Sequence, residues 1–169
     1  HYYEETRQVW QGLGIGLPPT FDEPKIGNFK PAAQAESTLM WSLDRGGLGP
    51  LEEVDGPERY VNFYAFLHIE SDRHIGTILD ALEGNAGLYD NTVVFRLADH
   101  GEMGLSHGGM RQKAYNAYEE TIHVPLVVSN PRLFAEPVET DALASLVDVM
   151  PTLLAAAGVS CVEGLAGPP

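Results

Sequence analysis

Apolar residues recur every three or four positions between residues 57 and 84, and this spacing predicts an amphipathic helix. The stripe consists of Tyr60, Tyr64, Leu67, Ser71, Ile75, Ile78 and Leu82. Pro57 suits the first helical position and Gly84 the C-terminal stop, while Asp55 or Gly56 would supply the N-cap. A helix of about 26 residues would be about 40 Å long, enough to cross a whole domain.

Two runs of β-branched and aromatic residues predict buried strands. The first run, residues 92–98, follows the turn-forming residues Asp90 and Asn91, and the second covers residues 124–130. The segment between them predicts a loop and a short helical stretch around "KAYNAYEET". The two strands are therefore expected to flank one long excursion of the chain.

Further helices are expected at both ends of this region. Residues 143–158 predict a helix, with Pro151 as a kink or restart and Gly158 as its stop. A short helix is expected at residues 32–42, within a Gly- and Pro-rich stretch, residues 12–57, that otherwise indicates connecting loop. The order helix, strand, helix, strand, helix predicts an α/β sheet covered on its faces.

Composition indicates a globular chain and narrows its partners. Of its 169 residues, 44% are hydrophobic, which is enough for a buried core. Ten Lys and Arg against 24 Asp and Glu give a net charge of −14, a sign that argues against nucleic acid as a partner. The sequence contains no continuous apolar run of about 18 residues, so it predicts no membrane-spanning helix. The single cysteine, Cys161, has no zinc-ligand spacing around it.

Polar side chains end the first predicted strand, at Asp99 and His100. In open α/β sheets the functional groups collect at the carboxyl ends of strands. Neighbouring strand residues point to opposite faces, so one metal ion could bind both side chains only if the backbone turns there, and Gly101 permits a turn. A carboxylate and an imidazole suit Zn, Mn, Mg or Ca. The alternative is an Asp-capped turn beside a surface histidine.

A lysine follows the strand end after a glycine-rich loop. Lys113 lies thirteen residues beyond His100, where the chain returns toward the second strand. A lysine near a metal ion can bind an anionic oxygen, although a solvated lysine on a helix is the alternative. His107, in "LSHGG", lies close enough in sequence to contact substrate or to be part of the loop structure. Glu102 could orient a ligand or be an exposed loop carboxylate.

Three motifs in order resemble the sulfatase family of the alkaline phosphatase superfamily. They are "YAFLHIESDRHIGTILDALE", "GLYDNTVVFRLADHGEMGLSHGGMRQKAYNAYEETIHVPLVV" and "LVDVMPTLLAAAGV", and the resemblance covers roughly residues 57–160. The resemblance implies an α/β fold, part of an alkaline-phosphatase-like sandwich with a mainly parallel sheet covered by helices. Residues 1–56 would be a connecting segment of the catalytic domain, and residues 57–169 its C-terminal portion.

The resemblance also implies roles for the positions that match. Asp99 would be a metal ligand, and His100 a second ligand or a catalytic contact to the nucleophile or leaving group. Lys113 would have a catalytic and binding role at the sulfate or phosphate oxygens. The cofactor would be one divalent cation, calcium first, with manganese or magnesium as alternatives and zinc if the enzyme is phosphatase-like. The Asp-His pair resembles choline-sulfatase-like and phosphonate monoester hydrolase-like branches, which leaves sulfate against phosphate open.

The family's nucleophile has no counterpart in this sequence. It is a formylglycine made from a cysteine or serine in a "CxPSR"-like segment, and Cys161 in "GVSCVEG" lacks the proline and arginine. Asp99, His100 and Lys113 cannot complete a six-ligand cation site by themselves. The nucleophile and further ligands are therefore expected from an N-terminal portion of the same catalytic domain, without which this chain alone is expected to be inactive.

These observations predict a metal-dependent hydrolase of sulfate esters that takes a small anionic ester. A phosphatase, phosphodiesterase or phosphonate monoester hydrolase of the same superfamily is the first alternative. A non-catalytic module that keeps the fold is the second alternative.

Overall fold

The computed structural model describes residues 2–27, 29–41 and 56–159. The chain divides into two compact units, His1–Leu133 and Phe134–Pro169. All the candidate site residues lie in the first unit. Cys161 and the candidate cap Asp55 lie outside the described residues. The domain boundary expected at residue 56 adjoins residues outside the described part and stays a prediction.

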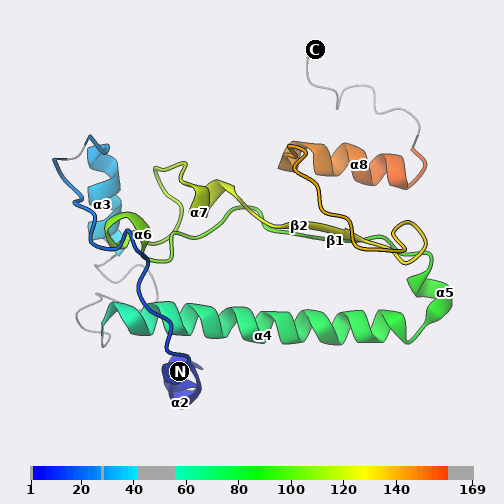
Figure 1. Ribbon diagram of the computed structural model, residues 1–169, viewed down its shortest axis with the longest axis horizontal. Helices are drawn as coiled ribbons and strands as arrows, with labels where there is room; N and C mark the ends of the chain where they lie inside the picture. Colours follow the sequence, from blue (N-terminus) through cyan, green and yellow to red (C-terminus); the bar gives the residue numbers. More distant parts are fainter. Residues whose placement is uncertain (1, 28, 42–55, 160–169) are drawn as a thin grey trace, which may run out of the picture. The chain divides into compact units, whose positions relative to one another are not determined.

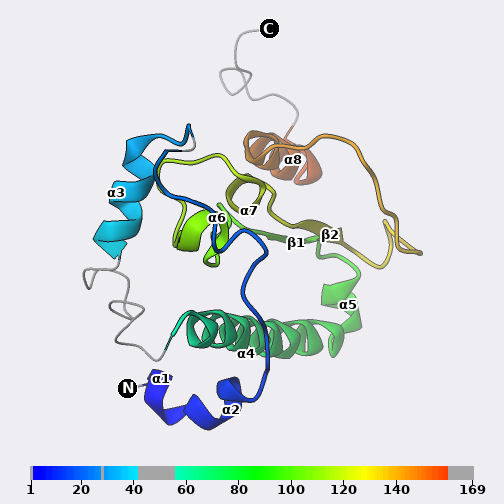
Figure 2. The ribbon, with the colours of Figure 1, turned by 60° about the vertical axis from the view of Figure 1, so that its left-hand side comes forward.

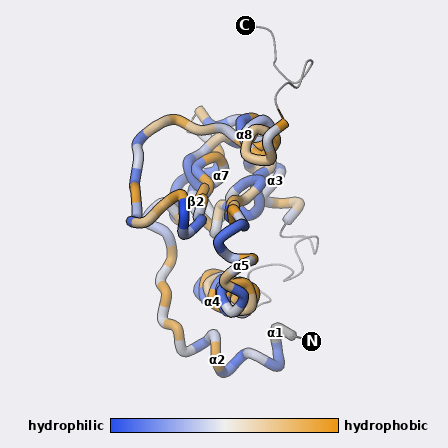
Figure 3. Tube along the Cα trace, turned by 90° about the vertical axis from the view of Figure 1, so that its right-hand side faces the viewer, coloured by the Kyte–Doolittle hydropathy of each residue, from blue (hydrophilic) through white to orange (hydrophobic). Residues whose placement is uncertain are grey.

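The long helix predicted from the apolar stripe is confirmed as α4, Pro57–Glu83, with 27 residues (Figure 1). Pro57 occupies its first turn, Gly56 is the N-cap and Gly84 the C-cap. A proline is tolerated at this end because the first backbone N–H groups have no partner inside the helix. Viewed along its axis, α4 carries both hydrophobic and hydrophilic residues around its circumference (Figure 3).

Of the two N-terminal helices, α1, Tyr2–Glu5, contacts α2, Arg7–Gln11, and α2 is anchored to α4 through an aromatic contact. Trp10 of α2 is fully buried, and its ring meets the Phe63 ring edge-on at 5.9 Å between centroids. Asn62 of α4 accepts a hydrogen bond from the Ile15 N–H at 2.9 Å and donates one to the Ile15 carbonyl at 2.8 Å. The beginning of the Gly- and Pro-rich stretch is therefore joined to α4 by hydrogen bonds.

The chain leaves α4 through α5, Ala86–Tyr89, and turns back into β1, Val94–Leu97 (Figure 1). The second strand is β2, Leu126–Ser129, so both predicted strands are present. The prediction that they are buried is wrong for this structure, in which every residue of both strands is exposed or half-buried. They form a two-stranded antiparallel sheet in which Val94 lies opposite Ser129. Arg96 of β1 forms an ion pair with Asp72 of α4 at 3.3 Å.

The mainly parallel sheet expected from the sequence does not appear in the described residues, where the one strand pair is antiparallel. A parallel connection needs a crossover of a dozen or more residues, usually with a helix, that carries the chain back along the sheet. The segment between β1 and β2 holds only the four-residue turns α6, Ser106–Gly109, and α7, Glu119–Ile122. It returns the chain to the end at which β1 stopped, so β2 runs in the opposite direction.

The short helices predicted from the sequence are confirmed in part. Helix α3, Ala32–Met40, lies where residues 32–42 predicted it (Figure 2). The stretch "KAYNAYEET" contributes only the start of α7. Tyr115, within that stretch, has a left-handed backbone with φ of 60°, which ends any helix there.

The second unit contains a 3-10 turn, Leu146–Asp148, followed by α8, Val149–Ala156, so the helix predicted over residues 143–158 is confirmed over a shorter range. Ser145 and Asp148 form a reciprocal capping box at its start. Pro151 is the third residue of α8 and neither kinks nor restarts it, because first-turn N–H groups have no intrahelical partner to lose. Gly158 follows α8 with φ of 77°, which matches the predicted stop. No helix in the described part of the chain is long and apolar enough to span a bilayer.

Candidate functional site

Asp99 and His100 lie just beyond the end of β1, where the backbone bends. The Asp99 side chain is 85% exposed and that of His100 37% exposed. Asp99 Oδ1 accepts a hydrogen bond from the His100 backbone N–H at 3.0 Å. The second carboxylate oxygen, Oδ2, lies 3.4 Å from His100 Nε2. The structure therefore brings the two predicted ligands together on one side of the chain.

The tautomer of His100 follows from its hydrogen bonds. Its Nδ1 lies 2.8 Å from the Gly101 carbonyl oxygen, which can only accept, so Nδ1 carries the proton and donates. In the neutral ring Nε2 then holds a lone pair that faces Asp99 Oδ2, another acceptor. Two acceptors at this distance repel unless a proton or a cation lies between them.

The donor set of this pair suits a divalent cation. Two ligands about 2.3 Å from one ion and at right angles lie about 3.3 Å apart, which is close to the 3.4 Å between Asp99 Oδ2 and His100 Nε2. Within residues 2–27, 29–41 and 56–159, no group of three or more His, Cys, Asp or Glu side chains is arranged to hold a metal ion. The pair could therefore supply two ligands of a larger set.

Gly101 has a different structural role from the one predicted. Its φ is not among the positive values of the described backbone, so the turn does not require a glycine. A side chain at this position would overlap the backbone carbonyl of Glu120 in α7. The Gly101 N–H also donates to the Thr121 carbonyl at 2.8 Å. Glycine is needed here because the strand end and α7 approach each other at backbone distance.

The loop between Gly101 and Lys113 has its own buried interior. Met103, Leu105 and Met110 are 2% exposed or less. The backbone folds back on itself, since the Met103 N–H donates to the Gln112 carbonyl at 3.2 Å and Leu105 N–H to the Met110 carbonyl at 2.9 Å. This closed loop, residues 101–113, is called the return loop below. Lys113 stands exposed at its end.

Lys113 makes no hydrogen bond or ion pair with Asp99 or His100 in the described part of the chain. It is instead linked to them through the backbone of the return loop. The predicted roles of Asp99, His100 and Lys113 stay predictions.

Glu102 is half-buried rather than the exposed loop carboxylate that was one of its two predicted interpretations. Its Oε1 accepts hydrogen bonds from the Tyr60 hydroxyl at 3.1 Å, the Gln112 N–H at 2.7 Å and the Gly104 N–H at 3.4 Å. Burial and the Glu102 charge raise the pKa of Tyr60, so the phenol stays protonated and donates. Burial, and then the same charge, also raise the pKa of Tyr64.

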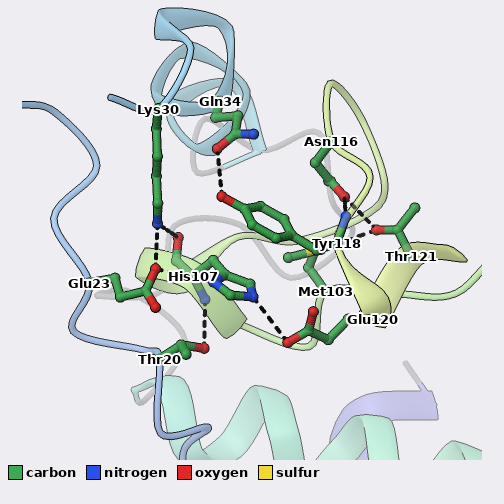
Figure 4. Close-up of polar contacts among 10 residues, drawn as sticks. All are labelled: Thr20, Glu23, Lys30, Gln34, Met103, His107, Asn116, Tyr118, Glu120 and Thr121. Atoms are coloured by element: carbon green, nitrogen blue, oxygen red, sulfur yellow. Dashed lines mark hydrogen bonds and ion pairs between the residues drawn. The ribbon is translucent and has the colours of Figure 1, made fainter. Parts of the chain in front are cut away.

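His107 lies in a separate cluster that joins the return loop to the N-terminal segment (Figure 4). Its Nδ1 is 3.1 Å from Glu23 Oε2 and its Nε2 is 3.3 Å from Glu120 Oε1. The ring stacks on Tyr118 with 3.8 Å between centroids and 10° between planes. With 17% of the side chain exposed and both nitrogens facing carboxylates, His107 holds two segments together in this structure. Its predicted contact with substrate is not tested and stays a prediction.

The same cluster holds the backbone of His107 in a left-handed conformation, with φ of 53°. The His107 N–H donates to Thr20 Oγ1 at 3.0 Å, and Lys30 Nζ donates to the His107 carbonyl at 3.4 Å. Such a conformation costs a non-glycine residue about 1–3 kcal/mol, and it persists only where surrounding contacts impose it. Residues from the Gly- and Pro-rich stretch therefore shape the return loop.

Glu23 gives this cluster a predicted pH dependence. Its hydrogen bonds with Lys30, at 2.6 Å, and with His107 lower its pKa. The stabilisation from charged Glu23 is therefore present above its ordinary pKa and is lost as the pH falls through the lowered value. We expect Glu23→Gln to lower the Tm of the full-length gene product at pH 7, with the gap to wild type closing below about pH 4. Glu36→Gln, a carboxylate outside this cluster, is the control, and a gap that does not change with pH would contradict the assignment.

Sequence reasoning missed Thr20, Glu23, Lys30 and Tyr60 as contributors to this region. The first three lie in a stretch without periodicity, and their partners are about 80 residues away in sequence, as for His107 and Glu23 with a separation of 84. Tyr60 was recognised only as a member of the apolar stripe. The polar hydroxyl of Tyr60 within that stripe, together with Glu102 in the loop after the first strand, is the one signal that could have suggested a polar partner.

Comparisons with known proteins identify the family of this chain. A family model described as Sulfatase matches residues 17–159. The chain therefore belongs to the sulfatase family. This confirms both the resemblance inferred from its motifs and the predicted α/β class of the fold.

Relatives with curated names are similar over most of this chain. Arylsulfatase K of Bos taurus is 34% identical over 181 residues, which cover 92% of this chain and 33% of that protein. Arylsulfatase K of Mus musculus is 34% identical over 182 residues, covering 92% and 32%, and that of Homo sapiens is 26% identical over 181 residues, covering 92% and 33%. The chain thus spans about one third of the length of these relatives. No solved structure gave a significant match.

Proposed function

We propose that the complete protein hydrolyses sulfate esters, with Asp99 and His100 as ligands of a divalent cation and Lys113 as a contact to the sulfate oxygens. The observation that carries the proposal is the pair of acceptor atoms, Asp99 Oδ2 and His100 Nε2, that face each other at 3.4 Å beyond the end of β1. Membership in the sulfatase family and the arylsulfatase names of the relatives support the reaction class.

The remainder of the site is proposed to come from outside these residues. The nucleophile, a formylglycine, and further cation ligands would belong to an N-terminal portion of the same catalytic domain. The whole domain is proposed to be an alkaline-phosphatase-like sandwich with a mainly parallel sheet, to which residues 57–169 contribute the C-terminal portion. Membership in the sulfatase family favours calcium, with manganese or magnesium as alternatives and zinc if the enzyme is phosphatase-like.

Asp99, His100 and Lys113 each have a distinct task in the proposed reaction. A bound divalent cation would neutralise negative charge that develops on the transferred sulfate group. Lys113 holds a sulfate oxygen as a compact positive charge. The Gly101 carbonyl keeps the His100 proton on Nδ1, which leaves Nε2 as the ligand atom. A ring nitrogen that binds a cation carries no proton, so His100 acts as a ligand and another group protonates the leaving oxygen.

A comparison of substrates tests this function. The full-length gene product, supplied with calcium, should hydrolyse 4-nitrophenyl sulfate at least tenfold faster than 4-nitrophenyl phosphate or bis(4-nitrophenyl) phosphate. Removal of the cation with a chelator should abolish turnover, and calcium should restore it. Faster hydrolysis of either phosphate would instead identify a phosphatase or phosphodiesterase of the same superfamily. No turnover of any substrate with calcium, manganese, magnesium or zinc would indicate a non-catalytic module.

A further inference from the structure

The return loop holds an unusual concentration of backbone strain. Leu105, His107 and Gln112 all have φ between 53° and 72°, in the left-handed region that residues with side chains rarely adopt. Gln112 directly precedes Lys113, so its conformation sets the direction in which the chain presents the lysine. Strained residues of this kind persist only where neighbouring contacts determine them, and they cluster at functional sites.

One carboxylate oxygen supplies the contacts that hold Gln112. Glu102 Oε1 accepts the Gln112 N–H at 2.7 Å, while the neighbouring Met103 N–H donates to the Gln112 carbonyl at 3.2 Å. Both polar groups of the strained residue are therefore bound to the start of the return loop. Glu102 lies two positions beyond His100, so the same side chain connects the proposed cation ligands to the residue before Lys113.

Helix α4 in turn fixes Glu102. The Tyr60 hydroxyl donates to the same Oε1 atom at 3.1 Å, from the first turn of a 27-residue helix. The guanidinium of Arg111, whose residue is only 3% exposed, lies over the Tyr60 ring at 5.7 Å. The orientation of Glu102 is therefore set by a rigid element rather than by the return loop alone.

We propose that Glu102 is a positioning residue that, through Tyr60 and Gln112, presents Lys113 to the anion held at the Asp99–His100 end of β1. This inference rests on the proposed function, because it assigns to Lys113 a bound sulfate oxygen. Glu102 itself does not touch the sulfate. Its contribution is the angle at which the return loop ends.

The test measures binding of inorganic sulfate by calorimetry, together with kcat and KM for 4-nitrophenyl sulfate, in the full-length gene product with calcium. Glu102→Ala removes the acceptor and should weaken sulfate binding about tenfold and lower kcat/KM by about 10- to 100-fold. Glu102→Gln keeps an oxygen acceptor for all three donors and should stay within about threefold of wild type. Tyr60→Phe, which removes only the hydroxyl, should weaken sulfate binding in the same direction by a smaller factor.

Asn62→Ala is the matched control for a purely structural effect. Asn62 is a buried residue of α4 that also makes three hydrogen bonds, but to Ile15 and Glu58 instead of the return loop. It should lower the Tm while leaving the sulfate affinity within about twofold of wild type. If Glu102→Ala and Tyr60→Phe bind sulfate as wild type does, or if Asn62→Ala loses sulfate affinity in the same proportion to its Tm, the inference is wrong. If Glu102→Ala does not fold, the Tyr60→Phe result decides.

Sulfate binding separates this inference from the proposed function. A wild-type protein that binds sulfate but hydrolyses none of the esters would contradict the proposed function, and the affinities of the variants would still decide the role of Glu102. A wild-type protein that does not bind sulfate would overturn the inference.

Discussion

Asp99→Asn in the full-length gene product should lower kcat/KM for 4-nitrophenyl sulfate by about 1000-fold, the largest effect expected of any single substitution in this chain. The substitution replaces a charged ligand by a neutral one of the same shape. The asparagine keeps the Oδ1 acceptor for the His100 N–H, which donates to Asp99 Oδ1 at 3.0 Å in the wild-type structure. Because the Asp99 side chain is 85% exposed, stability without the cation should change by less than about 0.5 kcal/mol.

The cation itself provides a second measurement for Asp99. Calcium should raise the Tm of the wild-type protein, since a ligand that binds only the folded state stabilises it. It should raise the Tm of the Asp99→Asn variant much less. Asp72→Asn is the control, because Asp72 is an exposed aspartate, 70% accessible, whose contact is an ion pair with Arg96. Wild-type turnover and an unchanged calcium shift in Asp99→Asn would rule out Asp99 as a ligand.

Lys113→Ala should lower kcat/KM by about 100- to 1000-fold, the range observed when one donor to a developing anionic oxygen is removed. Inorganic sulfate should inhibit this variant much less than it inhibits wild type. Lys113→Arg should recover only part of the activity, because a planar guanidinium does not occupy the position of a compact ammonium. Stability should be nearly unchanged, since Lys113 is exposed at the end of the return loop.

Lys25→Ala is the matched control for the loss of one positive charge. Lys25 is also exposed and lies in the same unit, so its removal alters the net charge equally. It should leave kcat/KM and inhibition by sulfate within about twofold of wild type. An equal loss in both lysine variants would indicate a general electrostatic effect, and full activity in Lys113→Ala would exclude the proposed contact.

The helices were largely predictable from the sequence, because their signals are local. The stripe of apolar residues and the terminal Pro57 and Gly84 predicted α4 with its observed limits. Both strands were predicted at nearly their observed positions. Their antiparallel pairing was not predicted, since the direction of β2 depends on where a 28-residue excursion returns the chain, and no local pattern records that.

The candidate site divides in the same way. Asp99 and His100 are adjacent in sequence, so their proximity needed only a bend after a strand. Tyr60 and Glu102 are 42 residues apart. Glu102 was recognised as a candidate to orient a ligand, but its partners in α4 and at Gln112 could not be read from the loop that contains it. The contact of His107 with Glu23 shows the same limit, because Glu23 lies 84 residues away.

The sequence alone therefore determined the family, the position of the long helix and the strands, and the residues at the end of β1 that carry the proposed chemistry. These features depend on hydrophobic periodicity, caps and short motifs, which act between residues a few positions apart. Only the tertiary structure decided three features. They are the direction of β2, the contacts of His107 with two carboxylates, and the hydrogen bonds by which Glu102 fixes the return loop. Those features depend on which distant segments meet, and that is set by the burial of apolar side chains across the whole unit.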